Sequence, residues 1–331
     1  MPIIDEPRTT DRLTIFGGRS HPAFTAAVCA HLGHPVGRAR LRTFSDGAIE
    51  VKLEENVRGH DVFIIQSGHQ APNDFLMELA FLIDAARRAS ARSVTAVLPY
   101  FPYMKGDKKD EPRVSIRARV VADILEAVGV DRVLTMDLHA AQLQGFFKVP
   151  VDNLYGLPVL AQEVEAEVRA GMIEQPVIVA PDAGRASLAR AYQRRLAHLG
   201  AGVAVGDKVR PELDEKSEVT ALLGDVRGRD AVLVDDIVFT GGTLCGMADE
   251  VMKAGARSVR AVVSHGLFTG GAVERISASP LREIIFTDTV PLDPRTAEQL
   301  GDRLRQVSVA SLFAEAIRSV FHQTSISRLF T

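Results

Sequence analysis

Tryptophan is absent from this chain of 331 residues, and only 4 tyrosines are present. The absence of tryptophan, with so few tyrosines, favours no aromatic platform for stacking of single-stranded nucleic acid. The net charge is −3, which gives no reason to expect electrostatic attraction to nucleic acid or to an anionic membrane. The composition therefore predicts no nucleic-acid partner and no membrane partner.

Long hydrophobic runs are also missing. No segment approaches 18 uninterrupted apolar residues, and the N-terminus lacks the apolar stretch of a secretory signal. The two cysteines, Cys29 and Cys245, are far apart in the sequence and lack metal-ligand spacing, which is typical of reduced thiols. These features predict a cytoplasmic protein.

Strand-like apolar runs alternate with helical patterns along the whole chain, whose length suits about two domains. Apolar strands that alternate with helices favour parallel sheets covered on both faces. In the first half, strands are predicted at Leu13–Gly17, Val62–Ser67, Ser93–Leu98 and Arg132–Met136, and helices at Asn73–Ala89 and Ser115–Val128. In the second half, strands are predicted at Val177–Ala180, Ala201–Val205, Ala231–Val234, Val259–Ser264 and Glu283–Thr287, and helices at Arg185–Leu199, Leu244–Ala254 and Gly271–Ser277.

The predicted fold class is α/β, with two doubly wound parallel-sheet domains side by side. The first domain is expected to span residues 1–155 and the second residues 156–308. A last helix at Val309–Val320, within the segment 309–331, is expected to pack back on the first domain.

The most informative pattern is an apolar run that leads into two carboxylates, Asp235 and Asp236, and then into the turn Thr240-Gly241-Gly242-Thr243. Such a turn, opening a helix at the carboxyl end of a buried strand, presents backbone N–H groups and hydroxyls to an anion. The carboxylates can hold sugar hydroxyls or, through water, a hard cation such as Mg²⁺. Phosphate and diol together describe a ribose 5-phosphate site; the alternative is a glycine-rich turn that binds nothing.

Residues 235–243 resemble the signature loop shared by type I phosphoribosyltransferases and phosphoribosyl pyrophosphate synthases. Further segments, in the same order along almost the whole chain, are similar to the synthase family. They are Phe44–Gly47, Glu54–Gly59, Phe63–Ser67, Leu76–Leu79, Thr135–Ala140, Gln142–Phe147, Pro181–Gly184 and Ser325–Phe330. The resemblance implies that both domains have the type I phosphoribosyltransferase-like fold.

The resemblance also implies a ribose-phosphate diphosphokinase. This enzyme moves the β,γ-diphosphoryl group of ATP onto the anomeric hydroxyl of ribose 5-phosphate or of a related sugar phosphate. Such a transfer needs Mg²⁺ as cofactor and cations that neutralise developing charge. The family's metal residues correspond to His139 and Asp182; His139 also belongs to the nucleotide site, and Asp182 would serve a second metal or the ribose hydroxyls. The alternatives are a structural histidine and, for Asp182, an N-cap of the predicted helix Arg185–Leu199.

Two polar stretches, Pro99–Val114 and Asp207–Lys216, interrupt the alternation and are predicted to be loops, either solvated surfaces or lids. The resemblance makes Lys208 and Arg210 in the second stretch a catalytic pair. A lysine point charge and an arginine fork suit a transferring diphosphoryl group.

The nucleotide site implied by the resemblance contains Phe44, Asp46, Lys105 and Asp107. Phe44 would stack on adenine and Asp46 would accept a hydrogen bond from its amino group. In the family these two residues reach ATP bound to a neighbouring subunit. The expected partners are therefore ATP, a sugar phosphate and further copies of the chain, as a dimer or hexamer.

Departures from the family pattern surround the predicted site. Ala48 stands where the family usually has Glu, Lys105-Gly106 where it has Arg-Gln, Phe239 where it usually has Asp, and Arg185 where it has Gly. These changes remove hydrogen-bonding groups at the nucleotide and sugar sites, and Arg185 adds a cation at a helix N-terminus. Together they favour altered substrate choice or reduced activity.

Two other functions compete with the diphosphokinase. One is a catalytically weak or inactive homologue that regulates an active synthase as a subunit, which the departures favour and the retained charged residues oppose. The other is a phosphoribosyltransferase, which would consume the diphosphate sugar. The two-domain length and the segment Phe44–Gly59 argue against a transferase.

Overall fold

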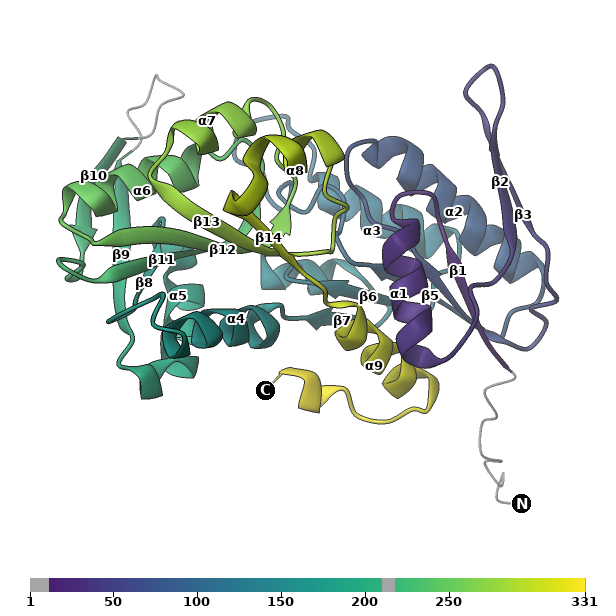
Figure 1. Cartoon of the computed structure of the whole chain (residues 1–331). Coiled ribbons are helices and arrows are strands. Elements are labelled where there is room, and N and C mark those ends of the chain that lie inside the picture. Colours follow the sequence, from purple (N-terminus) through teal and green to yellow (C-terminus); the bar gives the residue numbers. More distant parts are fainter. Residues whose placement is uncertain (1–11, 210–217, 331) are drawn as a thin grey trace. The chain divides into compact units, whose positions relative to one another are not determined.

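The computed structural model describes residues 12–209 and 218–330, with the backbone alone at 207–209, 218–221 and 330. Contacts between residues divide the chain into two compact units, both visible in Figure 1. The first comprises Met1–Tyr155, Thr289–Pro291 and Val309–Thr331, and the second comprises Gly156–Asp288 and Leu292–Ser308. The three-residue segment Thr289–Pro291 thus lies outside the unit in which its neighbours in sequence are found.

The first unit is built on a five-stranded sheet in the order β1-β4-β5-β6-β7, in which every pairing is parallel. Its central strands are apolar and buried, which explains why they appear in the sequence as uninterrupted apolar runs. The strands are β1 (Leu13–Gly17), β4 (Asp61–Ile65), β5 (Ser93–Leu98), β6 (Arg132–Met136) and β7 (Val151–Leu154). The helices are α1 (Pro22–Leu32), α2 (Pro72–Arg88), α3 (Arg117–Ala127) and α9 (Ala310–Phe321).

The C-terminal helix α9 packs against α1 of the first unit. The rings of Phe24 in α1 and Phe313 in α9 meet edge to face with centroids 5.4 Å apart, and both are buried. The guanidinium of Arg318 donates a hydrogen bond to the carbonyl of His31 at 3.2 Å. An aromatic pair buried in this way holds the end of the chain on the first unit.

A two-stranded antiparallel hairpin, β2 (Ala39–Thr43) and β3 (Ile49–Leu53), forms a separate small sheet in the first unit. Figure 1 shows its tip extending away from the five-stranded sheet, while β3 packs near α2. Most hairpin side chains are exposed or half-buried, so this element presents polar groups rather than filling a core.

The second unit contains a seven-stranded sheet in the order β10-β9-β8-β11-β12-β13-β14. All its pairings are parallel except that of β10 with β9, which is antiparallel. The strands are β8 (Val177–Ala180), β9 (Gly202–Val209), β10 (Glu218–Leu223), β11 (Asp230–Val238), β12 (Ser258–Gly266), β13 (Leu281–Thr287) and β14 (Leu304–Val307). The helices are α4 (Leu157–Arg169), α5 (Ala186–Arg195), α6 (Gly242–Lys253), α7 (Ala272–Ala278) and α8 (Pro294–Leu300).

Strand β11 shows why the second unit has helices on both faces of its sheet. Leu233 joins a core with Met247 of α6, whereas Val234 joins another core with Leu160 of α4 and Tyr192 of α5. Neighbouring side chains of a strand point to opposite faces, so burial of both requires a helical layer on each side. The α/β prediction of parallel sheets covered on both faces is confirmed.

Several predicted elements are wrong in their limits. The predicted helix Arg185–Leu199 is divided into two 3₁₀ turns, Ala183–Arg185 and Ala197–Leu199, with α5 between them. Asp207 to Val209, predicted as loop, continue strand β9 because they pair with β10. The loop at 99–114, all of whose residues are described, contains no helix or strand, as predicted. No helix within 12–209 and 218–330 is both long and apolar enough to cross a membrane.

Candidate active site

The carboxyl ends of neighbouring strands bring the predicted sugar-site residues of the second unit together. Strands β8 and β11 are adjacent and parallel, so Asp182, two residues after β8, lies at the same edge of the sheet as Asp235 and Asp236. In open α/β sheets ligands bind at this edge. The prediction that both carboxylates follow the strand is wrong: β11 continues to Val238 because Asp235 and Ile237 still pair with β12.

Arg185 bridges the two carboxylates. Its Nε lies 3.2 Å from Oδ1 of Asp235, and a terminal nitrogen lies 3.1 Å from Oδ2 of Asp236. The side chains of Arg185, Asp235 and Asp236 are 18%, 11% and 7% exposed, so the ion pairs are largely withdrawn from water. A guanidinium fork is well suited to contact two carboxylates at once.

Burial raises the pKa of Asp235 above its ordinary value, and the neighbouring charge of Asp236 raises it further. Arg185 and the backbone N–H of Asp236, which donates to Asp235 Oδ1 at 2.9 Å, act in the opposite direction but do not compensate. Burial and the second carboxylate therefore outweigh the effect of Arg185 on the pKa of Asp235. The hydroxyls of a vicinal diol, or a cation, would stabilise the charge of these carboxylates.

The turn after β11 has the geometry of an anion site. Gly241 has φ +74°, a left-handed conformation that favours glycine, and serves as the N-cap of α6 without a side-chain hydrogen bond. Thr240, Gly242 and Thr243 are exposed, so the start of the helix faces solvent. Arg275 donates to the carbonyl of Thr240 at 2.9 Å and fixes the turn. The helix begins at Gly242, two residues before the predicted start, so the turn and the helix N-terminus coincide.

Asp182 caps the 3₁₀ turn Ala183–Arg185. Its Oδ1 accepts a hydrogen bond from the backbone N–H of Arg185 at 3.2 Å. The capping role is confirmed, but the capped element is this 3₁₀ turn and not the predicted helix Arg185–Leu199, because α5 begins only at Ala186. The second oxygen, Oδ2, takes no part in that bond, so capping does not exclude the predicted role of Asp182 as a metal ligand, which stays a prediction.

The tip of the β2–β3 hairpin carries Phe44 and Asp46 in the first unit. Phe44 is 40% exposed, and the guanidinium carbon of Arg42 lies 4.2 Å from the centre of its ring. Asp46 is exposed, and its Oδ1 accepts a hydrogen bond from the backbone N–H of Ala48 at 3.0 Å. Arg42 was missed in the sequence, although its position two residues before Phe44 is the spacing of side chains on one face of a strand.

The loop between β5 and α3 carries Lys105, which is exposed, and Asp107, which is half-buried. Between them Gly106 is buried against Arg117 at the start of α3. A Cβ atom added at Gly106 would lie 2.6 Å from Nε and 2.9 Å from Cβ of Arg117. Arg117 therefore occupies the space that a longer side chain at position 106 would need. The sequence analysis did not single out Arg117.

His139 is half-buried, three residues after β6 ends. The intervening Asp137 has φ +40°, and its backbone N–H donates to the carbonyl of Leu154 at 2.9 Å. A positive φ at a residue other than glycine is uncommon, and aspartate tolerates it better than most. The sharp change of direction after β6 sets the position of His139 at the carboxyl edge of the first sheet.

The predicted catalytic pair is only partly described. Lys208 lies in β9 with its backbone paired to Val219, while its side chain lies outside the described part of the structure. Arg210 lies outside the described residues altogether. The structure thus brings together Asp182, Asp235 and Asp236 with the Thr240–Thr243 turn in the second unit, and it places Phe44, Asp46, Lys105, Asp107 and His139 in the first.

The donor set of these positions fits Mg²⁺ better than a softer metal, because carboxylate oxygens predominate. Within the described ranges, no three His, Cys, Asp or Glu side chains gather closely enough to hold a metal ion by themselves. Mg²⁺ usually keeps several waters and takes one or two carboxylates, so a sparse set of ligands is compatible with it.

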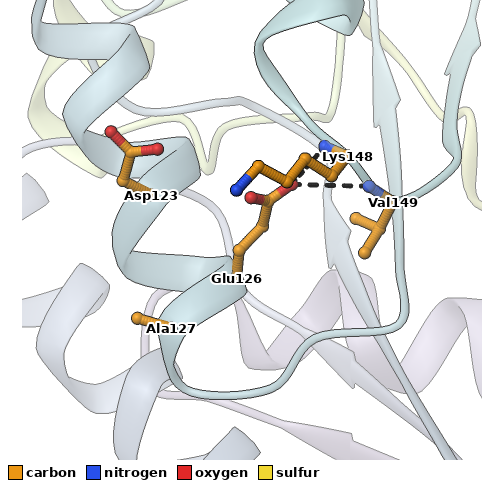
Figure 2. Close-up of a pocket in the computed structure, with 5 residues that line it drawn as sticks. All are labelled: Asp123, Glu126, Ala127, Lys148 and Val149. Carbon is orange, nitrogen blue, oxygen red and sulfur yellow. Dashed lines mark hydrogen bonds between the residues drawn. The ribbon is translucent and has the colours of Figure 1, made fainter.

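Figure 2 shows a surface pocket of the first unit that is separate from this set of residues. It is lined by Asp123, Glu126, Ala127, Lys148 and Val149. The carboxylate of Glu126 accepts hydrogen bonds from the backbone N–H groups of Lys148 and Val149, the latter at 3.4 Å. It holds the chain that leads into β7, and none of the predicted site residues lines the pocket.

Comparison with known proteins extends these observations to almost the whole chain. Residues 13–129 match the N-terminal domain of ribose phosphate pyrophosphokinase, and residues 210–331 match the phosphoribosyl synthetase-associated domain. A ribose-phosphate pyrophosphokinase of Rhizobium meliloti (strain 1021) is 46% identical over 318 residues, 96% of this chain and 100% of the relative. That of Vibrio cholerae serotype O1 (strain ATCC 39315 / El Tor Inaba N16961) is 46% identical over 319 residues, 96% of this chain and 99% of the relative.

A solved structure gives the same result at the level of the fold. The crystal structure of phosphoribosylpyrophosphate synthetase from Mycobacterium smegmatis has a TM-score of 0.86 and 36% sequence identity, and the match covers 94% of this chain and 99% of that one. Sequence, fold and the order of the motifs therefore agree, and the chain belongs to the ribose-phosphate pyrophosphokinase family.

Proposed function

We propose that this chain is a ribose-phosphate diphosphokinase that transfers the β,γ-diphosphoryl group of ATP to the anomeric hydroxyl of ribose 5-phosphate. The observation that carries the proposal is the adjacency of two largely buried carboxylates and an exposed helix-opening turn at the carboxyl ends of neighbouring strands, in a chain that matches its relatives over almost their whole length. Membership of the family alone would not identify which residues of this chain bind the substrates.

The sugar phosphate is bound by the second unit in this proposal. Asp235 and Asp236 accept hydrogen bonds from the vicinal ribose hydroxyls, because carboxylate oxygens are strong acceptors. The backbone N–H groups at Gly241, Gly242 and Thr243, with the hydroxyls of Thr240 and Thr243, bind the 5-phosphate at the start of α6.

The nucleotide is bound by Phe44, Asp46, Lys105, Asp107 and His139 in this proposal. Phe44 offers an exposed ring for stacking, and Lys105 places a cation in solvent beside the half-buried Asp107. Asp46 already accepts a hydrogen bond from Ala48, and its other oxygen accepts from the base amino group. The hairpin tip extends from its own sheet (Figure 1), and in this proposal, as in the resembled family, it contacts a nucleotide bound to a second copy of the chain, so that the active enzyme is a homo-oligomer.

His139 in the first unit would hold one Mg²⁺ ion, and Asp182 in the second unit would hold a second ion or contact the ribose hydroxyls; bound Mg²⁺ would supply positive charge to the phosphates. Asp182 keeps Oδ2 for this purpose while Oδ1 caps its own turn. Lys208 and Arg210 bring positive charge to the transferring group, so their effect falls on the chemical step.

The proposal is tested by incubating purified protein with Mg²⁺, each of several nucleoside triphosphates and each of several sugar phosphates, and measuring release of the nucleoside monophosphate. AMP formed from ATP only when ribose 5-phosphate is present supports the proposal. No monophosphate with any pair, in a protein shown by circular dichroism to be folded, contradicts it.

A second candidate function is a regulatory subunit of an active synthase, and one observation favours it: Arg185 already occupies the two carboxylates. The discriminating result is an absence of turnover by the chain alone, together with a change in kcat or KM of an active synthase to which it binds.

A further inference from the structure

We propose that Arg185 is a specificity-determining residue that competes with the sugar for Asp235 and Asp236 and so weakens the binding of ribose 5-phosphate. The inference rests on the proposed function and names the residue that limits it. It stands on the geometry of one side chain, which contacts both carboxylates of the sugar site.

Arg185 competes with the sugar because it contacts carboxylate oxygens that the sugar hydroxyls would use. Arg185 donates toward Oδ1 of Asp235 and Oδ2 of Asp236, one oxygen from each carboxylate. Asp235 Oδ1 also accepts from the backbone N–H of Asp236, so its capacity is further used. A vicinal diol needs acceptors on the same two groups. The sugar must therefore displace the guanidinium or share the carboxylates with it.

The positive charge of Arg185 also weakens the binding of a cation at Asp235 and Asp236. Asp236 and the ionised fraction of Asp235 carry negative charge, and the bridging guanidinium of Arg185 offsets part of it. A site with less negative charge attracts a divalent cation less strongly. Because Arg185 is 18% exposed, this charge is only partly screened by water.

The side chain of Arg185 is not needed to shape the backbone. Its φ of −99° and ψ of 1° are open to any residue, and the cap bond from Asp182 is made to its backbone N–H rather than to its guanidinium. Replacing the side chain therefore leaves the turn Ala183–Arg185 intact. This separates the competition from a purely structural role.

The experiment measures the Kd of ribose 5-phosphate by calorimetry, with Mg²⁺ present, for wild-type protein, Arg185→Gly and Arg185→Gln. Arg190→Gln is the matched control, because Arg190 is exposed on the following helix α5. We expect Arg185→Gly to lower the Kd at least about tenfold, because a bidentate competitor is removed. Arg185→Gln retains a neutral donor and should lie between, and Arg190→Gln should match the wild type. Melting temperatures and circular dichroism verify that all four proteins are folded.

Each other outcome has a distinct meaning. Equal Kd values for wild type and both Arg185 variants overturn the inference while the proposed function stands. Weaker binding by the Arg185 variants also overturns it, because Arg185 would then hold the sugar. Absence of binding by every variant, together with absence of AMP release, removes the proposed function and the inference with it. Binding by Arg185→Gly alone supports both.

Discussion

Strand β11 has a carboxylate–arginine arrangement at its amino end and another toward its carboxyl end, and the pKa values of the carboxylates shift in opposite directions. At the amino end, Asp230 is 1% exposed and accepts hydrogen bonds from Arg257, from the Ser258 hydroxyl at 2.7 Å and from the Glu174 backbone N–H at 2.7 Å. Burial opposes its ionisation, but these donors together lower the pKa of Asp230 below its ordinary value.

At the carboxyl end of the strand the balance is reversed. Asp235 and Asp236 share the guanidinium of Arg185, and burial together with their mutual repulsion raises the pKa of Asp235. The donors around Asp230 stabilise its charged form, as expected of a structural ion pair. Around Asp235 the charged form is disfavoured, so a ligand that brings positive charge or hydroxyls would be stabilising there. Parallel α/β sheets commonly place stability at the amino ends of strands and function at the carboxyl ends.

The largest expected effect is at the carboxyl end. Asp235→Asn combined with Asp236→Asn should lower kcat/KM for AMP formation at least about a thousandfold, because about 4 kcal/mol of interaction with the sugar and its cation is lost. The free energy of unfolding should change by less than about 1 kcal/mol, since the amides are nearly isosteric and their oxygens still accept from Arg185. Steady-state kinetics and urea unfolding measure the two quantities. Retention of more than about a tenth of the wild-type rate would mean that the pair does not bind substrate.

The matched change at the amino end, Asp230→Asn, should lower stability and leave activity nearly unchanged. Asp230→Asn removes a buried charge that accepts from Arg257, so the free energy of unfolding should fall by about 2 kcal/mol. The site lies at the other end of the strand, and kcat/KM per folded molecule should stay within about twofold of wild type. A large decrease in kcat/KM of Asp230→Asn, with an unchanged free energy of unfolding, would contradict the assignment of a structural role to Asp230.

Opposite pKa shifts at the two ends should give opposite pH dependences. The folded-state pKa of Asp230 is lowered, so its contribution to stability is present above about pH 4 and is lost as the pH falls further. The folded-state pKa of Asp235 is raised, so its contribution is present below about pH 4 and is lost as the pH rises through that pKa.

Urea unfolding of wild type, Asp230→Asn and Asp235→Asn between pH 3.5 and pH 9 checks both signs. The difference between wild type and Asp230→Asn should shrink at the acid end, and that between wild type and Asp235→Asn should change in the other direction, each by about 1 kcal/mol. Parallel curves for all three proteins would contradict the assigned shifts.

The smallest expected effect separates two roles of Asp182. Asp182→Asn keeps a good N-cap and should cost only a few tenths of a kcal/mol, whereas Asp182→Ala should cost about 1 kcal/mol. If Asp182 also binds Mg²⁺, both variants should raise the Mg²⁺ concentration that gives half-maximal rate. A normal Mg²⁺ dependence of Asp182→Asn would restrict Asp182 to capping.

The sequence predicted the layers of the fold because local patterns determine them. The apolar run before Asp235 is buried on both faces, and this pattern is readable without neighbours. The end of the strand was misplaced because Asp235 and Ile237 stay in the sheet only through pairing with β12, a contact set by tertiary structure. The β2–β3 hairpin was not predicted, since few of its residues are buried and its alternation is weak.

The site residues were found by type and motif, but their contacts were not. Arg185 and Asp235 are 50 positions apart, and they meet only because β8 and β11 are neighbours in the sheet. The sequence therefore identified Arg185 as unusual without indicating that it would bridge the carboxylates. The packing of Arg117 against Gly106 was also not predicted, because it depends on how the loop folds onto the start of α3.

That packing also couples the residues that positions 106 and 117 can accept. Any side chain at position 106 would collide with Arg117, since even a Cβ would lie 2.9 Å from the Cβ of that residue. Shortening residue 117 would remove the contact with Nε, but every residue except glycine keeps the Cβ. Glutamine at 106 therefore requires a shift of the backbone at the start of α3 or glycine at 117, so a substitution at one of these positions constrains the other.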